Sequence, residues 1–285
     1  MIIDSHCHVW ARWPYDPPVP DPEHRAAPGG LLWHMDRNGV DRAIVICAGI
    51  GDNPQNADFA FAAAERSDGR LEVFPDLECR WSPDFRAPGA RQRLQSALGR
   101  WKFRGFTSYL DEAENGAWLV GDEGLAFFGL AARHNLIASL SVLPHQVPRV
   151  AELARRLPDL PILLHHLAFL GPRTSATRDG AAHVVLAAAC PNIHVKLSGF
   201  GNVAGPDDAY PYPRLGWIPQ MLHSAFGSDR LIWGSDHPVS GRHMTYRQSL
   251  DMVAVHGPGD SAARDAMLGA NIARILGGTA ARAGP

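Results

Sequence analysis

The sequence predicts a (β/α)8 barrel, and three observations carry that prediction. Eight short runs of β-branched or apolar residues alternate with longer stretches rich in alanine and leucine. Several of those stretches stop at Gly or Asn, as helices commonly do, and the next run begins within a few residues. No glycine-rich dinucleotide fingerprint follows any run, which disfavours the rival doubly wound open sheet. We therefore expect residues 1–285 to form one barrel domain with a loop insert at 11–30.

The expected strands are short and follow one another at regular intervals. They cover residues 1–8, 42–48, 71–77, 102–108, 137–143, 161–166, 193–199 and 231–236. The expected helices lie between them and cover residues 31–39, 56–67, 90–100, 123–135, 146–157, 180–190 and 217–227. This order, strand then helix throughout, is the one that a barrel of parallel strands requires.

Two of the connections are unusually long. Residues 11–30 follow the first strand and contain six prolines, so we expect no helix there. Residues 200–216 follow the seventh strand and are similarly rich in Gly and Pro. Both connections leave the carboxyl ends of strands, the face on which barrel active sites lie, and both are long enough to be lids.

Composition points to a soluble, cytoplasmic protein that acts on a small molecule. The net charge is −2 and no basic run of five or more residues occurs, which disfavours nucleic acid and anionic membrane surfaces as partners. No window is apolar enough to span a membrane, and no secretion signal begins the chain. The four cysteines are spaced singly, as expected for reduced thiols. The sequence leaves the oligomeric state open, a homo-oligomer included.

The first strand carries two histidines one residue apart, in the segment DSHCH. Side chains alternate between the two faces of a strand, so Asp4, His6 and His8 should share one face. Ser5 and Cys7 should take the other, which makes Cys7 a core residue rather than a ligand. An acidic and imidazole-rich face of this kind suits a metal ion or a bound substrate.

Further polar side chains close two later strands. His166 ends the sixth strand and Asp236 ends the eighth, so a barrel would bring them to the same mouth as His6 and His8. Three imidazoles and one carboxylate suit zinc, whose catalytic sites use nitrogen and oxygen ligands and keep one position open. The structural alternative is that Asp236 caps the proline-containing turn that follows it.

Four motifs together resemble the amidohydrolase superfamily, and specifically its amidohydrolase-2 branch. They are DSHCH, ILLHH after RRLPDLP, VKLSG, and DRLIWGSDHPVSG. The proline-rich WPYDPPVPD and the order of the motifs are most similar to lactonases that open sugar lactones and 2-pyrone-4,6-dicarboxylate. The resemblance covers residues 2 to about 241 and implies a (β/α)8 fold with His6, His8, His166 and Asp236 lining the site.

The same resemblance bears on the metal and the substrate. Members of the superfamily hold one or two divalent ions at these positions, whereas some pyrone-type lactonases use none. No histidine ends the fifth strand here and no bridging Lys or Glu follows the fourth, so we expect one ion, zinc first, or none. Lactonases of this branch often carry an arginine after the glycine of the fourth strand, where this chain has Thr107. A dicarboxylate pyrone is therefore disfavoured as the substrate.

The predicted reaction is hydrolysis of a lactone or related cyclic ester. Asp236 would take a proton from the attacking water, and zinc on His6, His8 and His166, or those imidazoles as donors, would polarise the carbonyl. His166 and Asp236 are the predicted catalytic residues. Six side chains near the mouth are predicted to bind substrate, with packing or structural pairing as the alternative: Trp10, Tyr109, Lys196, Ser198, His237 and Arg242.

Two other functions remain open at this point. A metal-dependent, non-oxidative decarboxylase of aromatic or unsaturated acids is one, but such enzymes generally place a catalytic histidine on the seventh strand, where this chain has only His194 near the start. A catalytically inactive ligand-binding barrel is the other. Retention of a costly polar cluster at one mouth argues against it.

Overall fold

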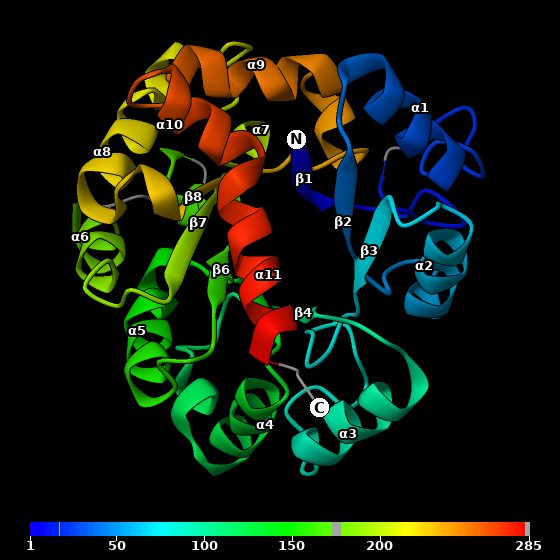
Figure 1. Ribbon diagram of the computed structural model, residues 1–285, viewed down its shortest axis with the longest axis vertical. Coiled ribbons are helices and arrows are strands. Elements are labelled where there is room, and N and C mark those ends of the chain that lie inside the picture. The colour runs from blue at the N-terminus through cyan, green and yellow to red at the C-terminus, as the bar shows by residue number, and fades with distance from the viewer. Residues whose placement is uncertain (17, 173–177, 283–285) are drawn as a thin grey trace.

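The computed structural model describes residues 1–16, 18–172 and 178–282, and it confirms the predicted barrel. Its parallel strands follow one another in chain order (Figure 1): β1 (Ile3–Cys7), β2 (Arg42–Ile46), β3 (Leu71–Phe74), β4 (Gly105–Tyr109), β5 (Ile137–Ser141), β6 (Ile162–Leu164), β7 (Ile193–Leu197) and β8 (Leu231–Trp233). Parallel bridges join Asp76 to Thr107 and Cys7 to His237, so the two hydrogen-bonded runs of strands, β1–β3 and β4–β8, close into one ring.

Backbone hydrogen bonds hold the seam between the first and last strands. His8 N donates to His237 O, and Asp236 N donates to His6 O, both at 2.7 Å. The ends of β1 and β8 are thus joined at the residues expected to form the site.

Helices surround the strands as an outer layer (Figure 1). All seven helices expected from the sequence are present: α1 (Pro28–Asn38), α2 (Asn56–Glu65), α3 (Ala90–Arg100), α4 (Asp122–Arg133), α5 (Val147–Arg156), α6 (Arg178–Ala187) and α8 (Trp217–Phe226). A short helix, α7 (Phe200–Val203), follows β7. No helix of the described residues is long and apolar enough to cross a bilayer.

The helical content differs from the expectation at two places. The insert was expected to hold no helix, yet α1 begins at Pro28, because proline in the first helical turn lacks only an N–H that would have no partner there. Three helices follow β8, in a part of the chain for which the sequence analysis predicted none: α9 (Tyr246–His256), α10 (Ser261–Asp265) and α11 (Asn271–Arg282). Their signals were Thr245 with Gln248, which form a capping box, and Asp260, which caps α10.

The interior of the barrel is filled at the end opposite the strand carboxyl ends. Inward apolar side chains of the strands, such as Ile44 and Phe74, form one cluster with Ile272, Ile275 and Leu276 of α11. Figure 1 shows α11 lying across this end of the ring. The polar side chains therefore have only the other end of the barrel in which to gather.

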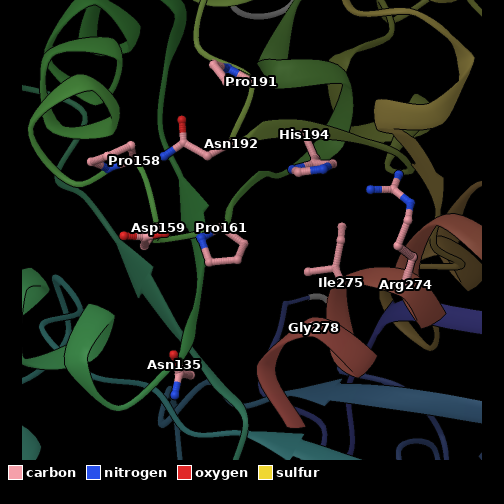
Figure 2. A pocket seen from close by; sticks show the side chains of 10 residues that line it. All are labelled: Asn135, Pro158, Asp159, Pro161, Pro191, Asn192, His194, Arg274, Ile275 and Gly278. Carbon is pink, nitrogen blue, oxygen red and sulfur yellow. The ribbon is translucent and has the colours of Figure 1, made fainter. Parts of the chain in front are cut away.

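A cavity of about 230 Å³ lies beside α11 at this closed end (Figure 2). His194 of β7 and Arg274 of α11 line one side of it, and Pro158 and Pro161 of the loop before β6 line another. His194 is 6% exposed. Burial, and secondarily the charge of Arg274, lower its pKa to about 4. None of the residues predicted to be functional lines this cavity.

We expect His194 to make the fold sensitive to acid. Its pKa is lower in the folded chain than the ordinary 6.5, so the unfolded chain binds the proton first as the pH falls. The stability that the neutral ring contributes is complete above about pH 6.5 and falls by about 3 kcal/mol towards pH 4. Urea unfolding across this range should show a shallower loss for His194→Gln than for the unsubstituted chain. Parallel curves for the two proteins would contradict this assignment.

Candidate active site

The first strand is irregular where the two histidines lie. Its pairing with β2 slips by one residue between Asp4 and Cys7, which marks a β-bulge. The Asp4 carboxylate accepts hydrogen bonds from the Ser235 N–H (2.9 Å), the Ser235 hydroxyl (2.5 Å) and the Tyr246 hydroxyl (3.0 Å). The expectation that Asp4 shares a face with the two histidines is therefore wrong, because the extra residue of the bulge breaks the alternation.

Four of the predicted residues come together around a single oxygen atom. The Nε2 atoms of His6, His8 and His166 lie 3.6, 3.3 and 3.8 Å from Asp236 Oδ1. All four side chains are buried. Residues that are as far as 230 positions apart in the chain thus form one polar cluster at the carboxyl ends of β1, β6 and β8.

Two of these imidazoles are held through their other nitrogen. His8 Nδ1 lies 2.7 Å from Ile46 O, and His166 Nδ1 lies 3.0 Å from Ser198 Oγ. A carbonyl oxygen can only accept, so His8 carries a proton on Nδ1, and Nε2 of the neutral ring is an acceptor that faces the Asp236 carboxylate. Two acceptors 3.3 Å apart require a proton or a cation between them.

Lys196 lies behind His6, with its ammonium group buried. Its Nζ atom lies 2.9 Å from Ser5 O, 2.8 Å from Ser139 Oγ and 3.2 Å from His6 Nδ1. Burial lowers the pKa of Lys196 to about 7. When Lys196 is charged, His6 Nδ1 must accept, and the proton of the neutral imidazole lies on Nε2. An uncharged amine can instead accept from Nδ1–H, which leaves Nε2 free to bind a metal ion.

The donor atoms of His6, His8 and Asp236 fit a single zinc ion. Ligand atoms about 2.1 Å from a tetrahedral zinc lie about 3.4 Å from one another, close to the 3.6 and 3.3 Å that separate the Nε2 atoms of His6 and His8 from Asp236 Oδ1. His6 Nε2 is buried and has no hydrogen-bond partner among the described residues, as a vacant ligand atom would be. His6, His8 and Asp236 form one set of close donor atoms, and His6, His165 and His166 form another.

Burial and charge set the protonation of the cluster. Burial lowers the pKa of His166 to about 4, although the Asp236 carboxylate opposes this. Burial and the Lys196 charge also hold the pKa of His6 far below its ordinary value. Burial alone would raise the pKa of Asp236, but His166 and His8, together with a hydrogen bond from Asn202, bring it below its usual 3.8. At neutral pH, Asp236 is therefore an anion beside the neutral rings of His6 and His166.

Two glycines leave room for the imidazoles. A Cβ atom on Gly199 would lie 2.4 Å from His166 Nδ1, and one on Gly234 would lie 2.7 Å from His6 Cβ. His166 begins a turn in which all residues up to Phe169 have φ between 45° and 57°, a left-handed conformation that side chains rarely adopt. Strain of this kind is typical of functional sites.

A cavity of about 360 Å³ opens above the cluster. His8, His166 and Asp236 form its polar floor, and Tyr109 and Arg242, both predicted to bind substrate, line its wall. The wall also contains several polar residues that were not predicted from the sequence: Tyr15, Arg80, Glu112, Ser141, Gln146 and Asn202. Tyr15 and Asn202 belong to the two long connections, which gave a general signal but did not identify individual residues.

The remaining predicted substrate contacts lie outside that wall. Trp10 is fully buried, stacks on His8 with ring centroids 4.8 Å apart, and donates from Nε1 to Ala48 O. Lys196 and Ser198 support imidazoles from behind, and His237 lines a neighbouring cavity. Parity along the seventh strand predicts the face of Lys196 and Ser198 but not their depth, and position after a strand does not tell whether Trp10 or His237 reaches the catalytic cavity.

Asn202 and His165 contact the cluster, and the sequence predicted a role for neither of them. Asn202 Nδ2 donates to Asp236 Oδ2 at 2.9 Å and so fixes the carboxylate. His165 Nε2 lies 2.7 Å from Ser139 Oγ, the hydroxyl that Lys196 Nζ also contacts at 2.8 Å. The segment FGN after VKLSG was the only signal for Asn202.

Known proteins resemble this chain over most of its length. It is 30% identical over 250 residues to an L-fucono-1,5-lactonase of Burkholderia ambifaria, an alignment that covers 84% of this chain and 80% of that protein. The structure of an amidohydrolase from Burkholderia multivorans with bound zinc has a TM-score of 0.78 at 24% identity, with 97% and 99% of the two chains covered. A putative 2-pyrone-4,6-dicarboxylic acid hydrolase from Pseudomonas putida has a TM-score of 0.72 at 20% identity, with 97% of each chain covered.

The family assignment rests on the whole barrel. A sequence model described as amidohydrolase matches residues 3–278, a span that includes every strand and all four residues of the polar cluster. The resemblance inferred from the four motifs is thereby confirmed. The chain belongs to the amidohydrolase family and is a hydrolase.

Proposed function

We propose that the protein hydrolyses a sugar lactone, using water activated by Asp236 and one zinc ion held by the cluster. The observation that carries this proposal is the convergence of three imidazole Nε2 atoms on Asp236 Oδ1 at the floor of a polar cavity. The similarity to an L-fucono-1,5-lactonase supports the substrate class. We further propose that residues 1–285 form a single catalytic domain.

The wall of the cavity favours a neutral, hydroxylated substrate. Its hydroxyl, amide and carboxylate groups can exchange hydrogen bonds with a polyol. Arg80 lies 3.6 Å from Glu112, so much of its charge is already compensated. Arg242 stacks over Tyr15 at 4.8 Å and donates from Nε to Val239 O. A doubly charged dicarboxylate would need more uncompensated positive charge than this wall offers, and a sugar lactone does not.

The chemistry follows from the protonation of the cluster. Asp236 is an anion, with Oδ2 held by Asn202 and Oδ1 facing the imidazoles, so it can take a proton from a water molecule that attacks the lactone carbonyl. An imidazole with a proton on Nε2 can donate to the carbonyl oxygen as negative charge develops there. Asp236 then returns its proton to the leaving ring oxygen, which opens the lactone to a hydroxy acid.

The residues that would hold the metal are His6, His8, His166 and Asp236. A bound zinc ion supplies Lewis acidity at the carbonyl and lowers the pKa of a coordinated water. The tautomer that Ile46 imposes on His8 makes its Nε2 a ready ligand.

Metal content and turnover of the purified protein test this proposal together. We expect about one zinc per chain, hydrolysis of L-fucono-1,5-lactone or related aldonolactones in a proton-release assay, and loss of turnover after chelation that added zinc restores. His8→Asn should lose the metal, whereas His194→Gln, a buried histidine outside the cluster, should keep it. Full turnover in metal-free protein would contradict the zinc part, and the imidazoles alone would then polarise the carbonyl.

A decarboxylase is the competing proposal. It would need an acid–base histidine near the cluster on β7, but His194 lines the cavity at the opposite end of the barrel (Figure 2). Release of carbon dioxide from a panel of aromatic and unsaturated acids, with no lactone hydrolysed, would favour the decarboxylase instead.

A further inference from the structure

A second cavity lies beside the catalytic one, between the proline-rich insert, α1 and the start of α9. Its volume is about 600 Å³, and among the described residues it shares no lining side chain with the catalytic cavity. Arg25, His34, His237 and Thr245 contribute polar groups to its lining. These groups come from four different segments of the chain, and none of them takes part in the proposed hydrolysis.

Arg25, which is exposed at the rim of this cavity, brings a positive charge without an ion-pair partner among the described residues. Within the described part of the chain, its guanidinium has no ion-pair or hydrogen-bond partner, and its Cζ atom lies 5.8 Å from the centre of the Trp13 ring. A Cβ atom on Gly241 would lie 2.9 Å from Arg25 Nη2, so the absence of a side chain at that position makes room for the guanidinium. Arg25 and His34 line the same cavity, and burial, followed by the charge of Arg25, lowers the pKa of His34.

Two neutral imidazoles lie beside Arg25 and add N–H donors to the wall. The rings of His34 and His237 have centroids 4.8 Å apart, and neither ring forms a hydrogen bond with the residues that the structure describes. Both side chains are half-buried, and their ring nitrogens are available to a ligand.

The N-terminus of α9 completes the wall. Thr245 caps this helix by accepting from Gln248 N, and the first turn of an 11-residue helix carries a partial positive charge. One carboxylate, that of Asp21, also lines the cavity, but it lies 2.7 Å from His24 Nδ1 and is compensated there.

We propose that this cavity binds a small oxyanion, the carboxylate or phosphate group of an organic molecule, with Arg25 as its main anchor. An anion would pair with the guanidinium, accept from an imidazole N–H and lie at the positive end of α9. Pro20, Val19 and the aromatic ring of Tyr246 give the cavity an apolar side that suits the rest of such a molecule. His237 of this cavity directly follows Asp236 in the chain, but binding of an anion in the cavity does not depend on lactone hydrolysis.

Calorimetric titration with inorganic phosphate and with succinate at low ionic strength tests the proposal. We expect saturable binding of at least one probe, with a Kd of about 1 mM, and weakening by about tenfold or more in Arg25→Gln. Arg12→Gln is the matched control, because Arg12 lies in the same insert but is paired with Glu23. Arg242→Gln removes an arginine of the catalytic cavity and should also leave the affinity unchanged.

The two probes and a second variant separate the outcomes. Tighter binding of phosphate or of succinate tells which oxyanion the cavity prefers, and either result supports the proposal. Gly241→Ala should weaken binding by less than Arg25→Gln does, since the flexible end of Arg25 can move away from the added Cβ atom without losing its charge. Absence of saturable binding by both probes, or a loss in Arg242→Gln with none in Arg25→Gln, would overturn it. Imidazole NMR signals of His34 and His237 should shift during the titration while those of His8 stay in place.

Discussion

Asp236→Asn should lower kcat on any aldonolactone that the protein hydrolyses by about a thousandfold, within the range of 10²–10⁴ ascribed to a positioned general base. The amide has the shape of the carboxylate, and Asn202 can still contact it, but it cannot take a proton from water. It also removes the anion on which three imidazoles converge, so we expect weaker zinc retention in the same protein.

Steady-state kinetics and metal analysis of the purified variant measure these two effects separately. Asp76→Asn is a matched control: Asp76 is a half-buried carboxylate close to the end of β3, and it accepts hydrogen bonds from Gly49 N and Trp81 Nε1 rather than from the cluster. We expect Asp76→Asn to keep its zinc and most of its turnover. Unchanged kcat in Asp236→Asn would remove Asp236 from the role of base.

Gly199→Ala should lower kcat/KM by about a hundredfold, although Gly199 makes no contact with the cavity. Its Cβ atom would lie 2.4 Å from His166 Nδ1 and would push the imidazole away from Asp236 and Ser198. The residue also has a φ of 62°, which costs about 1–2 kcal/mol when a side chain is added.

Gly39→Ala separates the two effects. Gly39 has a similar φ of 66°, but nothing lies within 4 Å of the position of its Cβ atom. Thermal unfolding should therefore show a loss of stability in both variants, whereas only Gly199→Ala should lose turnover and zinc. Equal turnover in the two alanine variants would show that His166 tolerates displacement, contrary to its proposed role.

The fold could be predicted from the sequence because each element carried its own local signal. Strand runs such as 42–48 are apolar on both faces, and helices such as 123–135 end at Asn, so the alternation was visible without long-range information. The helices after β8 were missed although Thr245 and Gln248 form a recognisable capping box. The bulge in β1 gave no local signal, because it arises from how that strand pairs with its neighbour.

The centre of the site could be predicted and its wall could not. His6, His8, His166 and Asp236 end strands, and the barrel topology alone brings strand ends together. Residues of the long connections depend on loop conformation, so Tyr15 and Asn202 were missed. Trp10 and Lys196 belong to the correct region, but strand periodicity contains no information on whether a side chain reaches the cavity or lies beneath it.

The seam between β1 and β8 links the assembly of the cluster to the closure of the ring. His6 and Asp236 become neighbours only when the final strand docks against the first, and the hydrogen bond from Asp236 N to His6 O belongs to that same junction. A chain with an open ring could contain most of the secondary structure and still hold His6 and His8 apart from His166 and Asp236. Recovery of turnover during refolding then reports the closure of the ring, and it should lag behind the return of the helical circular-dichroism signal.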